Sequence, residues 1–341
     1  MVHRCDILGR IVSAAVLGLL LVCSVSCETE NPSEGDYGTV PLIFDSPSIL
    51  YSHETKASVN GSEFPPSPSA YPLGVWIVKG GTYQEQITEF RNMKSELHVG
   101  AGNEIHWNYY VYNGTRQYDL IYVMKGRPAD IYAYHPWKSY VDDITAIPFT
   151  SGQEDWMWAT PVNLSSSDTN TDEPIVRELA FAHAMTCIEV NIRCLYQGSV
   201  RFTSMTLTDE ADTPRLIASG TMNAVNGELT CDAPVSSITI TPNVSLTYTA
   251  AGTTVFIIMP QVGDDDNPLD LTNKKMTLSF KFNGIDAKTS FTIPSVMGGS
   301  QLNAFKRGYK YKFNLVLDNK IDFIPVGVEQ DWGIKYVDFE L

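Results

Sequence analysis

The sequence predicts an all-β protein of two tandem β-sandwich domains that follow an N-terminal signal segment. The length of 341 residues suits two domains, since a domain commonly has roughly 100–200 residues. Tyrosine is abundant at 17 residues and charged residues make up only 18%, a composition that favours pleated sheets over helices. Short apolar segments recur between turn signals, and helical periodicity is scarce.

Residues 1–26 have the pattern of a signal peptide. Arg4 and Arg10 precede an apolar run over 11–22, which is too short to span a bilayer and suits a secretory signal. The small residues 24–26 then lead to Cys27, as in a bacterial lipobox, although serine stands at position 24 where leucine is usual. We expect cleavage before Cys27 and attachment of lipid to its thiol. An ordinary signal peptide with an incidental Cys27 is the alternative.

The beginning of the mature chain is acidic. Residues 28–36 are rich in turn formers and acids, which predicts a tether rather than a domain. The whole chain has a formal net charge of −15. So acidic a surface argues against nucleic acid and against adsorption to anionic membranes. The lipid on Cys27 would therefore supply the attachment to the outer membrane.

The first predicted domain covers residues 57–172. Before it, Val40–Phe44 has the alternation of a short strand, and a proline-rich loop over 46–69 follows. Lys56 lies in this loop between small residues, as at tips where proteases cut. Polar residues 163–173 mark the expected boundary. The later strands and hairpins of this domain are expected at Tyr71–Val78, Glu104–Met124 with an Asn113-Gly114 turn, Ala129–Trp137 and Asp155–Ala159.

The second predicted domain covers residues 173–341 and repeats the pattern. Its clearest hairpin is Lys275–Ile293, in which Leu278, Phe280 and Phe282 would face Ile285, Ala287 and Thr289 across Asn283-Gly284. Its other strands are expected at Leu179–Tyr196, Val200–Thr208, Ala218–Cys231 with an Asn226-Gly227 turn, Ser236–Thr241, Thr253–Met259, Tyr309–Leu317 and around Trp332.

The stretch Leu179–Cys194 contains one histidine and two cysteines, so a metal site, a redox site and plain core are all conceivable. Seven positions separate Cys187 from Cys194, roughly 23 Å on a strand. The two thiols can then neither bond each other nor share a metal. Cys231 is the other cysteine of the mature chain that would carry no lipid, and only a pairing with Cys231 could make a disulfide. We expect core packing for this stretch.

The phase of this stretch changes along its length. His183 shares one face with Phe181, whereas Ile188 and the residues at every second position after it have the other parity. We therefore expect a bulge near residues 185–187. His183 is predicted to be a satisfied, inward-facing polar residue.

Other candidate sites are weaker. Residues 264–267 combine three acids with an asparagine, but their spacing fits a solvated hairpin tip better than a calcium loop. No catalytic motif, phosphate loop or cofactor motif is present, so we expect neither an enzyme nor a cofactor, and no metal. A glycan platform needs exposed rings, and the candidates are Trp107, Tyr109, Tyr110, Tyr112, Tyr132, Tyr134, Trp137, Trp156 and Trp158.

Several short motifs follow one another along the chain. They are Thr55-Lys56-Ala57, Leu73-Gly74-Val75-Trp76, Ile131–Pro136, Gln153 with Asp155–Ala159, Leu179–Ile192, Met259-Pro260-Gln261, Gly308–Tyr311 with Asn314-Leu315, and Trp332. In this order they resemble the fimbrillin family, the subunits of type V pili of Bacteroidota and related surface lipoproteins. The acidic run after Cys27 also resembles the surface-export signal of such lipoproteins.

The resemblance implies transthyretin-like sandwich domains and assembly by strand exchange. Residues 27–56 would hold the lipid anchor and a removable first strand, and Lys56–Ala57 would be the bond that a trypsin-like protease cuts. The family's best-known members have arginine there, which Lys56 departs from. A donor strand from a neighbouring subunit would fill the groove. Its inserted side chains would come from Ile334 and Tyr336, or from Val337, Phe339 and Leu341.

The expected protein is thus a surface-exposed structural subunit, or an accessory or tip adhesin, of a fimbria. It would pass through the periplasm, stay anchored in the outer membrane by lipid, and bind other subunits as a homo- or heteropolymer. If Trp332 belongs to the last core strand, no donor remains, and a tip or accessory role follows. The alternative is a surface lipoprotein that binds host or bacterial glycans, or surface proteins, without polymerising.

Overall fold

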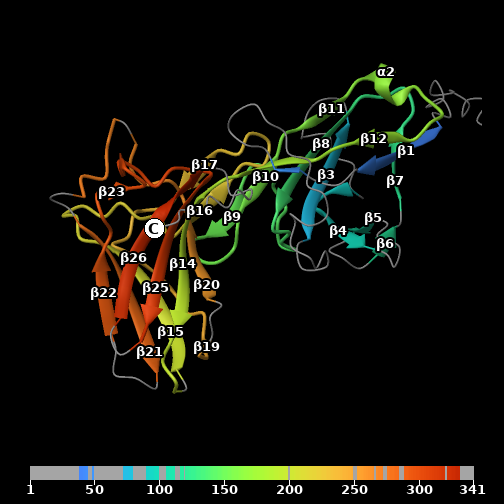
Figure 1. The fold of residues 1–341 in the computed structure, drawn as a ribbon. Coiled ribbons are helices and arrows are strands. Elements are labelled where there is room, and N and C mark those ends of the chain that lie inside the picture. The colour runs from blue at the N-terminus through green and yellow to red at the C-terminus, as the bar shows by residue number, and fades with distance from the viewer. Residues whose placement is uncertain are drawn as a thin grey trace, which may run out of the picture. The chain divides into compact units, whose positions relative to one another are not determined.

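The computed structural model describes residues 38–44, 48–49, 72–79, 90–99, 105–111, 116–118, 120–198, 200–248, 252–264, 266–271, 275–283, 288–318 and 321–330. Cys27, the Lys56–Ala57 bond and residues 331–341 lie outside these ranges, so what was predicted for them stays a prediction. The described part consists of strands and one short helix, α2 (Ser166–Thr169), which confirms the all-β class (Figure 1). None of the helical structure described is long and apolar enough to cross a membrane.

Two sheets enclose the first core. The smaller, called the β1 sheet, has the order β12-β1-β7, with bounds Ile175–Arg177, Thr39–Phe44 and Ile121–Met124. The larger, called the β8 sheet, has the order β2-β13-β10-β8-β3-β4-β5-β6, and β11 pairs with β8. Its strands are β2 (Ser48–Ile49), β3 (Leu73–Lys79), β4 (Met93–Val99), β5 (Ile105–Val111), β6 (Arg116–Tyr118), β8 (Ala129–His135), β10 (Met157–Ala159), β11 (Val162–Leu164) and β13 (Ala180–His183). Inward side chains such as Leu42, Val75 and Phe181 form this core.

Two further sheets enclose the second core. The β14 sheet has the order β20-β14-β25-β26, with bounds Thr253–Met259, Thr186–Cys194, Tyr309–Leu317 and Ile321–Gln330. The β15 sheet has the order β18-β15-β21-β22, with bounds Ser237–Ile240, Val200–Asp209, Met276–Asn283 and Lys288–Thr292, and β19 (Val244–Leu246) pairs with β15. Phe202, Phe280 and Phe313 are among the buried residues between these sheets.

A third core lies against the other face of the β8 sheet. A small sheet of order β17-β16-β9, with bounds Leu229–Cys231, Ser219–Met222 and Ile147–Thr150, contributes to it. Trp76, Tyr132 and Trp156 are buried here together with Met222. Because β9 pairs with β16, residues far apart in sequence share this core. A short ribbon of β23 (Val296–Met297) and β24 (Ser300–Gln301) completes the described strands.

The stretch Leu179–Cys194 divides between two sheets. Its first part, β13, pairs with β10, and its second part, β14, pairs with β20 and β25. The expected change of phase therefore occurs at Ala184–Met185, between two strands that lie in different sheets. Two strands were one of the two forms expected for this stretch, but the bulge expected to join them was wrong. Both β12 and β13 follow the boundary expected at residue 172, and both pair with strands that precede it.

The three predicted hairpins are present. β5 pairs with β6, β16 with β17, and β21 with β22. In the last hairpin Phe280 pairs with Thr289, so the expected partner Ala287 was wrong by two residues. A shift of two keeps each side chain on its face, because the side-chain period of a strand is two.

Candidate functional site

The candidate site is the buried first strand, β1. Val40, Leu42 and Phe44 are only 1%, 0% and 2% exposed, while the residues between them are partly exposed. Each fully buried side chain of this size stabilises the fold by roughly 1.5–3 kcal/mol. Strand β1 lies between β12 and β7, and therefore fills the middle of its sheet (Figure 1). The predicted alternation of this strand is confirmed.

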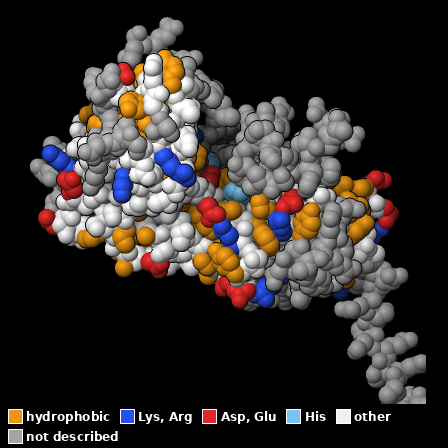
Figure 2. Space-filling view, turned by 90° about the horizontal axis from the view of Figure 1, so that it is seen from below, with side chains coloured by type: hydrophobic (Ala, Val, Ile, Leu, Met, Phe, Trp, Pro, Cys, Tyr) orange, Lys and Arg blue, Asp and Glu red, His pale blue; other side chains and the backbone are white. Residues whose placement is uncertain are grey.

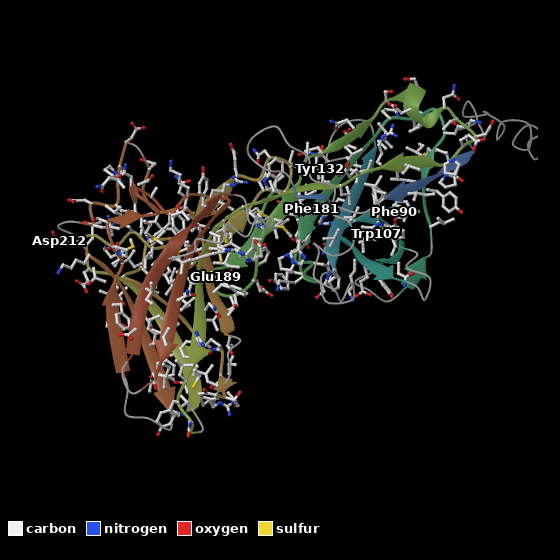
Figure 3. All side chains as sticks on the ribbon, in the orientation of Figure 1. Phe90, Trp107, Tyr132, Phe181, Glu189 and Asp212 are labelled. Carbon is white, nitrogen blue, oxygen red and sulfur yellow. The ribbon has the colours of Figure 1, made fainter. Side chains whose placement is uncertain are left out.

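Aromatic rings of β5 form the floor beneath the end of β1. The Phe44 ring centroid lies 6.5 Å from that of Trp107 and 6.3 Å from that of Tyr109, with edge-to-face geometry in both pairs. Burial raises the pKa of the Tyr109 phenol well above its usual value, and a hydrogen bond with the Phe44 backbone opposes part of that rise. Figure 3 labels Trp107 and Phe181, which belong to this core, and Phe90, which packs against it. Removal of β1 would uncover an apolar floor.

The successive strands β1 and β2 pair with two other successive strands, β12 and β13. In β1, Leu42 pairs in parallel with Ile175 of β12. In β2, Ile49 pairs in parallel with Phe181 of β13. Strand β1 therefore pairs with β12 in the β1 sheet, and β2 pairs with β13 in the β8 sheet. Release of this segment would open backbone hydrogen-bonding positions in both sheets.

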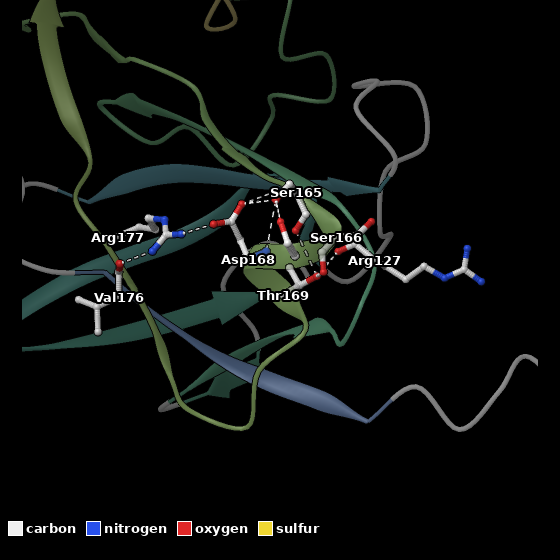
Figure 4. Close-up of polar contacts among 8 residues, drawn as sticks. Arg127, Ser165, Ser166, Asp168, Thr169, Val176 and Arg177 are labelled. Atoms are coloured by element: carbon white, nitrogen blue, oxygen red, sulfur yellow. Dashed lines mark hydrogen bonds and ion pairs between the residues drawn. The ribbon is translucent and has the colours of Figure 1, made fainter.

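Helix α2 fixes the strand that would remain beside the groove (Figure 4). Ser165 caps the helix, and its side chain and that of Asp168 form a reciprocal capping box. Asp168 Oδ1 also lies 3.2 Å from Arg177 Nη2 at the end of β12. The Thr169 hydroxyl donates to the Arg127 carbonyl oxygen at 2.8 Å. Strand β12 therefore has one ion pair that does not involve β1, while its pairing in the sheet is with β1.

The histidine and cysteines of Leu179–Cys194 are core residues, as predicted. His183 is 7% exposed, and its Nδ1 lies 2.9 Å from Asp155 Oδ2. Cys187 belongs to the third core and Cys194 to the second, which confirms that they face opposite sides. Both thiols and that of Cys231 are free. Among the described residues, no group of three or more His, Cys, Asp or Glu side chains is placed to hold a metal.

The acidic segment at 264–267 forms a turn at its described ends. Asn267 N donates to Asp264 Oδ1 at 2.6 Å, and Asp264 N donates to the Asn267 carbonyl oxygen at 3.1 Å. The polar groups of the segment thus bond to each other, in the manner of an Asx-type turn.

Most rings of the expected glycan platform are inside the protein. Trp156 is 1% exposed and belongs to the third core. Tyr110 and Trp137 are partly exposed, and Lys94 Nζ lies 5.2 Å and 5.6 Å from their ring centroids. The other buried rings are Trp107, Tyr109, Tyr132 and Tyr134, Trp158 is partly exposed, and Tyr112 lies outside the described residues.

Sequence reasoning missed two strands, β12 and β26. β12 has only three residues, and its pairing with β1 is parallel, so no turn signal joins them. It also missed β26, although Ile321 and Phe323 flank the polar Asp322 shortly before Pro325. Alternation around the proline could have revealed β26, whereas nothing local could have revealed the partner of β1.

The packed sheets around the buried first strand define an all-β protein of the β-sandwich class. Three solved structures share this fold, each described as a candidate cell adhesion protein. The one from Bacteroides uniformis is 15% identical with a TM-score of 0.52, and the alignment covers 86% of this chain and 98% of that one. That from Bacteroides ovatus is 15% identical with a TM-score of 0.52, covering 88% and 99%. That from Bacteroides fragilis is 9% identical with a TM-score of 0.53, covering 88% and 100%.

A family model described as Fimbrillin-like matches residues 70–332. The chain therefore belongs to the fimbrillin-like family, which confirms the resemblance seen in the sequence. No curated protein matches the chain. Membership supports a fimbrial or adhesive role at the cell surface, in association with fimbrial subunits, rather than an enzymatic one.

Proposed function

We propose that the chain is a fimbrial subunit or fimbrillin-like adhesin in which β1 is removed by proteolysis and replaced by a strand from a neighbouring subunit. The observation that carries this proposal is the position of β1. It is the middle strand of its sheet, and its alternate residues are buried. A sheet that loses its middle strand exposes unpaired backbone groups and an apolar slot, and a donated strand satisfies both.

The processing site of the proposal is the Lys56–Ala57 bond, seven residues after Ile49. A cut there would leave both β1 and β2 without a covalent link to the rest of the sandwich. The lipid on Cys27 would hold the uncut chain at the outer membrane, and the acidic tether would give it reach. Cutting would then free the subunit from that anchor at the moment when its groove opens.

The donor of the proposal is the end of the chain. In β1, the buried residues Val40, Leu42 and Phe44 recur at every second position. Val337, Phe339 and Leu341 have the same spacing, which favours this phase. Ile334 and Tyr336 offer the other phase. A strand of either phase would place large apolar side chains against Trp107 and Tyr109.

Limited trypsin digestion tests the proposal. The purified full chain is cut, and the products are separated on a gel without boiling. A ladder of heat-sensitive multimers is expected once cutting after Lys56 has occurred. Cutting there with a product that remains monomeric would refute polymerisation for this chain. The Lys56→Gln variant is the matched control, and it should give no ladder.

Glycan binding without polymerisation is the second candidate, and one observation favours it. Tyr110 and Trp137 keep part of their rings at the surface, with Lys94 close to both. Aromatic faces beside polar groups are usual in sugar sites. Binding to a glycan array that is lost in Trp137→Ala and kept in Trp156→Phe would support it.

A further inference from the structure

The outer face of the β1 sheet is apolar as well as its inner face. Its outward side chains are Thr39, Pro41, Ile43, Tyr122, Met124 and Val176. None of these six is charged, and the hydroxyls of Thr39 and Tyr122 are their only polar groups. Val176 is 52% exposed and Tyr122 is 41% exposed. Ile43 and Val176 are paired across β1 and β12, so their side chains are neighbours. These six residues are called the outer β1 face.

Most other outward-facing strand residues are polar, except on β26, where Ile324, Val326 and Val328 are 46%, 42% and 40% exposed. β15 and β21 turn Thr206, Thr208, Ser279 and Lys281 away from the core. β14 and β25 turn out chiefly charged and amide side chains, which are Glu189, Asn191, Arg193, Lys310, Lys312 and Asn314. On the surface drawn in Figure 2, charged side chains of both signs are scattered among hydrophobic ones. The outer β1 face lacks such charges, which is typical of a surface that another molecule covers.

The net charge of the chain indicates which kind of molecule covers the outer β1 face. The chain has a net charge of −15, so two copies repel each other over most of their surfaces. An uncharged apolar face is where two such copies can meet with least repulsion. The face is also small, because six side chains cannot bury the roughly 800 Å² per partner of a stable interface. A second copy would thus need another attachment, and the proposed inserted strand at the centre of this face supplies one.

We propose that the body of the strand-donating copy rests on the part of the outer β1 face that remains after β1 is removed, with Tyr122 and Val176 as its contacts. Both residues belong to β7 and β12, which follow the Lys56–Ala57 bond in the sequence and so remain part of the cut chain. They would flank the inserted strand on either side. This contact rests on the proposed strand exchange and adds a second, side-chain contact to it.

Charged variants of the face test this contact. Tyr122→Glu and Val176→Glu are compared with Tyr248→Glu and Val296→Glu, whose side chains are exposed elsewhere at 63% and 44%. Each full chain is cut with trypsin, and multimers are measured on unboiled gels. Binding of a synthetic peptide of residues 331–341 is measured on the same cut chains. Urea unfolding midpoints check that all four variants fold.

The expected result is a roughly tenfold loss of multimers for the two variants of the face, as for a central interface residue. The two control variants should polymerise normally, and all four should bind the peptide as the unsubstituted chain does. Equal polymerisation of all variants would overturn the contact while leaving strand exchange intact. Absence of both peptide binding and multimers in the unsubstituted chain would overturn strand exchange and the contact together. Normal multimers with lost co-sedimentation on lipid vesicles would assign the face to the membrane instead.

Discussion

At the scale of single residues, Asn92 is the most connected polar side chain near β4. It is 4% exposed and has a positive φ of 49°. Its Nδ2 donates to the carbonyl oxygens of Lys138 and Val141, both at 2.9 Å. Its Oδ1 accepts from the Tyr134 hydroxyl at 2.7 Å, and its backbone carbonyl accepts from Trp137 Nε1 at 3.0 Å. Asn92 thus ties the start of β4 to the chain that follows β8.

We predict that Asn92→Ala lowers the free energy of unfolding by about 2–4 kcal/mol, because it leaves buried donors and acceptors without partners and strains a positive φ. Urea unfolding measures the loss. The control is Asn243→Ala, since Asn243 has a φ of 54° and an exposed side chain. That variant should lose only about 1 kcal/mol. Equal losses in both would mean that the hydrogen bonds of Asn92 contribute nothing.

At the scale of strands, the sequence predicts which face of a strand is buried better than it predicts which strands pair. The alternation of Val40, Leu42 and Phe44 predicted which side chains are buried, because period two depends on the strand alone. The register of Phe280 was wrong because the described ladder of this hairpin ends at Lys281 and Lys288, and not beside the Asn283-Gly284 turn signal. The partners of β1 and β14 come from distant parts of the chain, and parallel pairing leaves no turn residues to read. Strand β1 was therefore predictable from the sequence, but the strands that pair with it were not.

Loss of β1 should change the titration of Tyr109. Burial raises the pKa of this phenol, so its proton is held more tightly with β1 in place than in the open chain. The stabilisation is complete below the ordinary pKa of about 10 and is lost as pH rises through the folded value. We predict that displacement of β1 lowers this pKa towards 10. Absorbance at 295 nm near pH 11 should then increase by about one tyrosinate.

Tyr109→Phe should abolish this increment, and Tyr311→Phe should leave it unchanged. Burial raises the pKa of Tyr311 to about 12, but Tyr311 lies in the second core, away from β1. An increment that persists in Tyr109→Phe would show that β1 does not cover this ring.

At the scale of the whole molecule, the described residues from Val40 onward form one compact unit around three cores. Strand β1 contributes to only one of them. The second and third cores, and the contacts of Arg177 with α2, do not depend on it. A protein built in this way can exchange one strand while the rest stays folded, which is what a subunit joined by donated strands requires.

The most direct test of this account is a reversible lock on β1. Ile43 and Val176 are paired residues on the outer face, so Ile43→Cys with Val176→Cys can place a disulfide between β1 and β12. Cys27→Ser and Cys231→Ser remove the other accessible thiols, since Cys187 and Cys194 are buried. After trypsin cutting, the oxidised protein should stay monomeric, and reduction should release β1 and produce the ladder of multimers. Multimers formed with the disulfide intact would contradict the account.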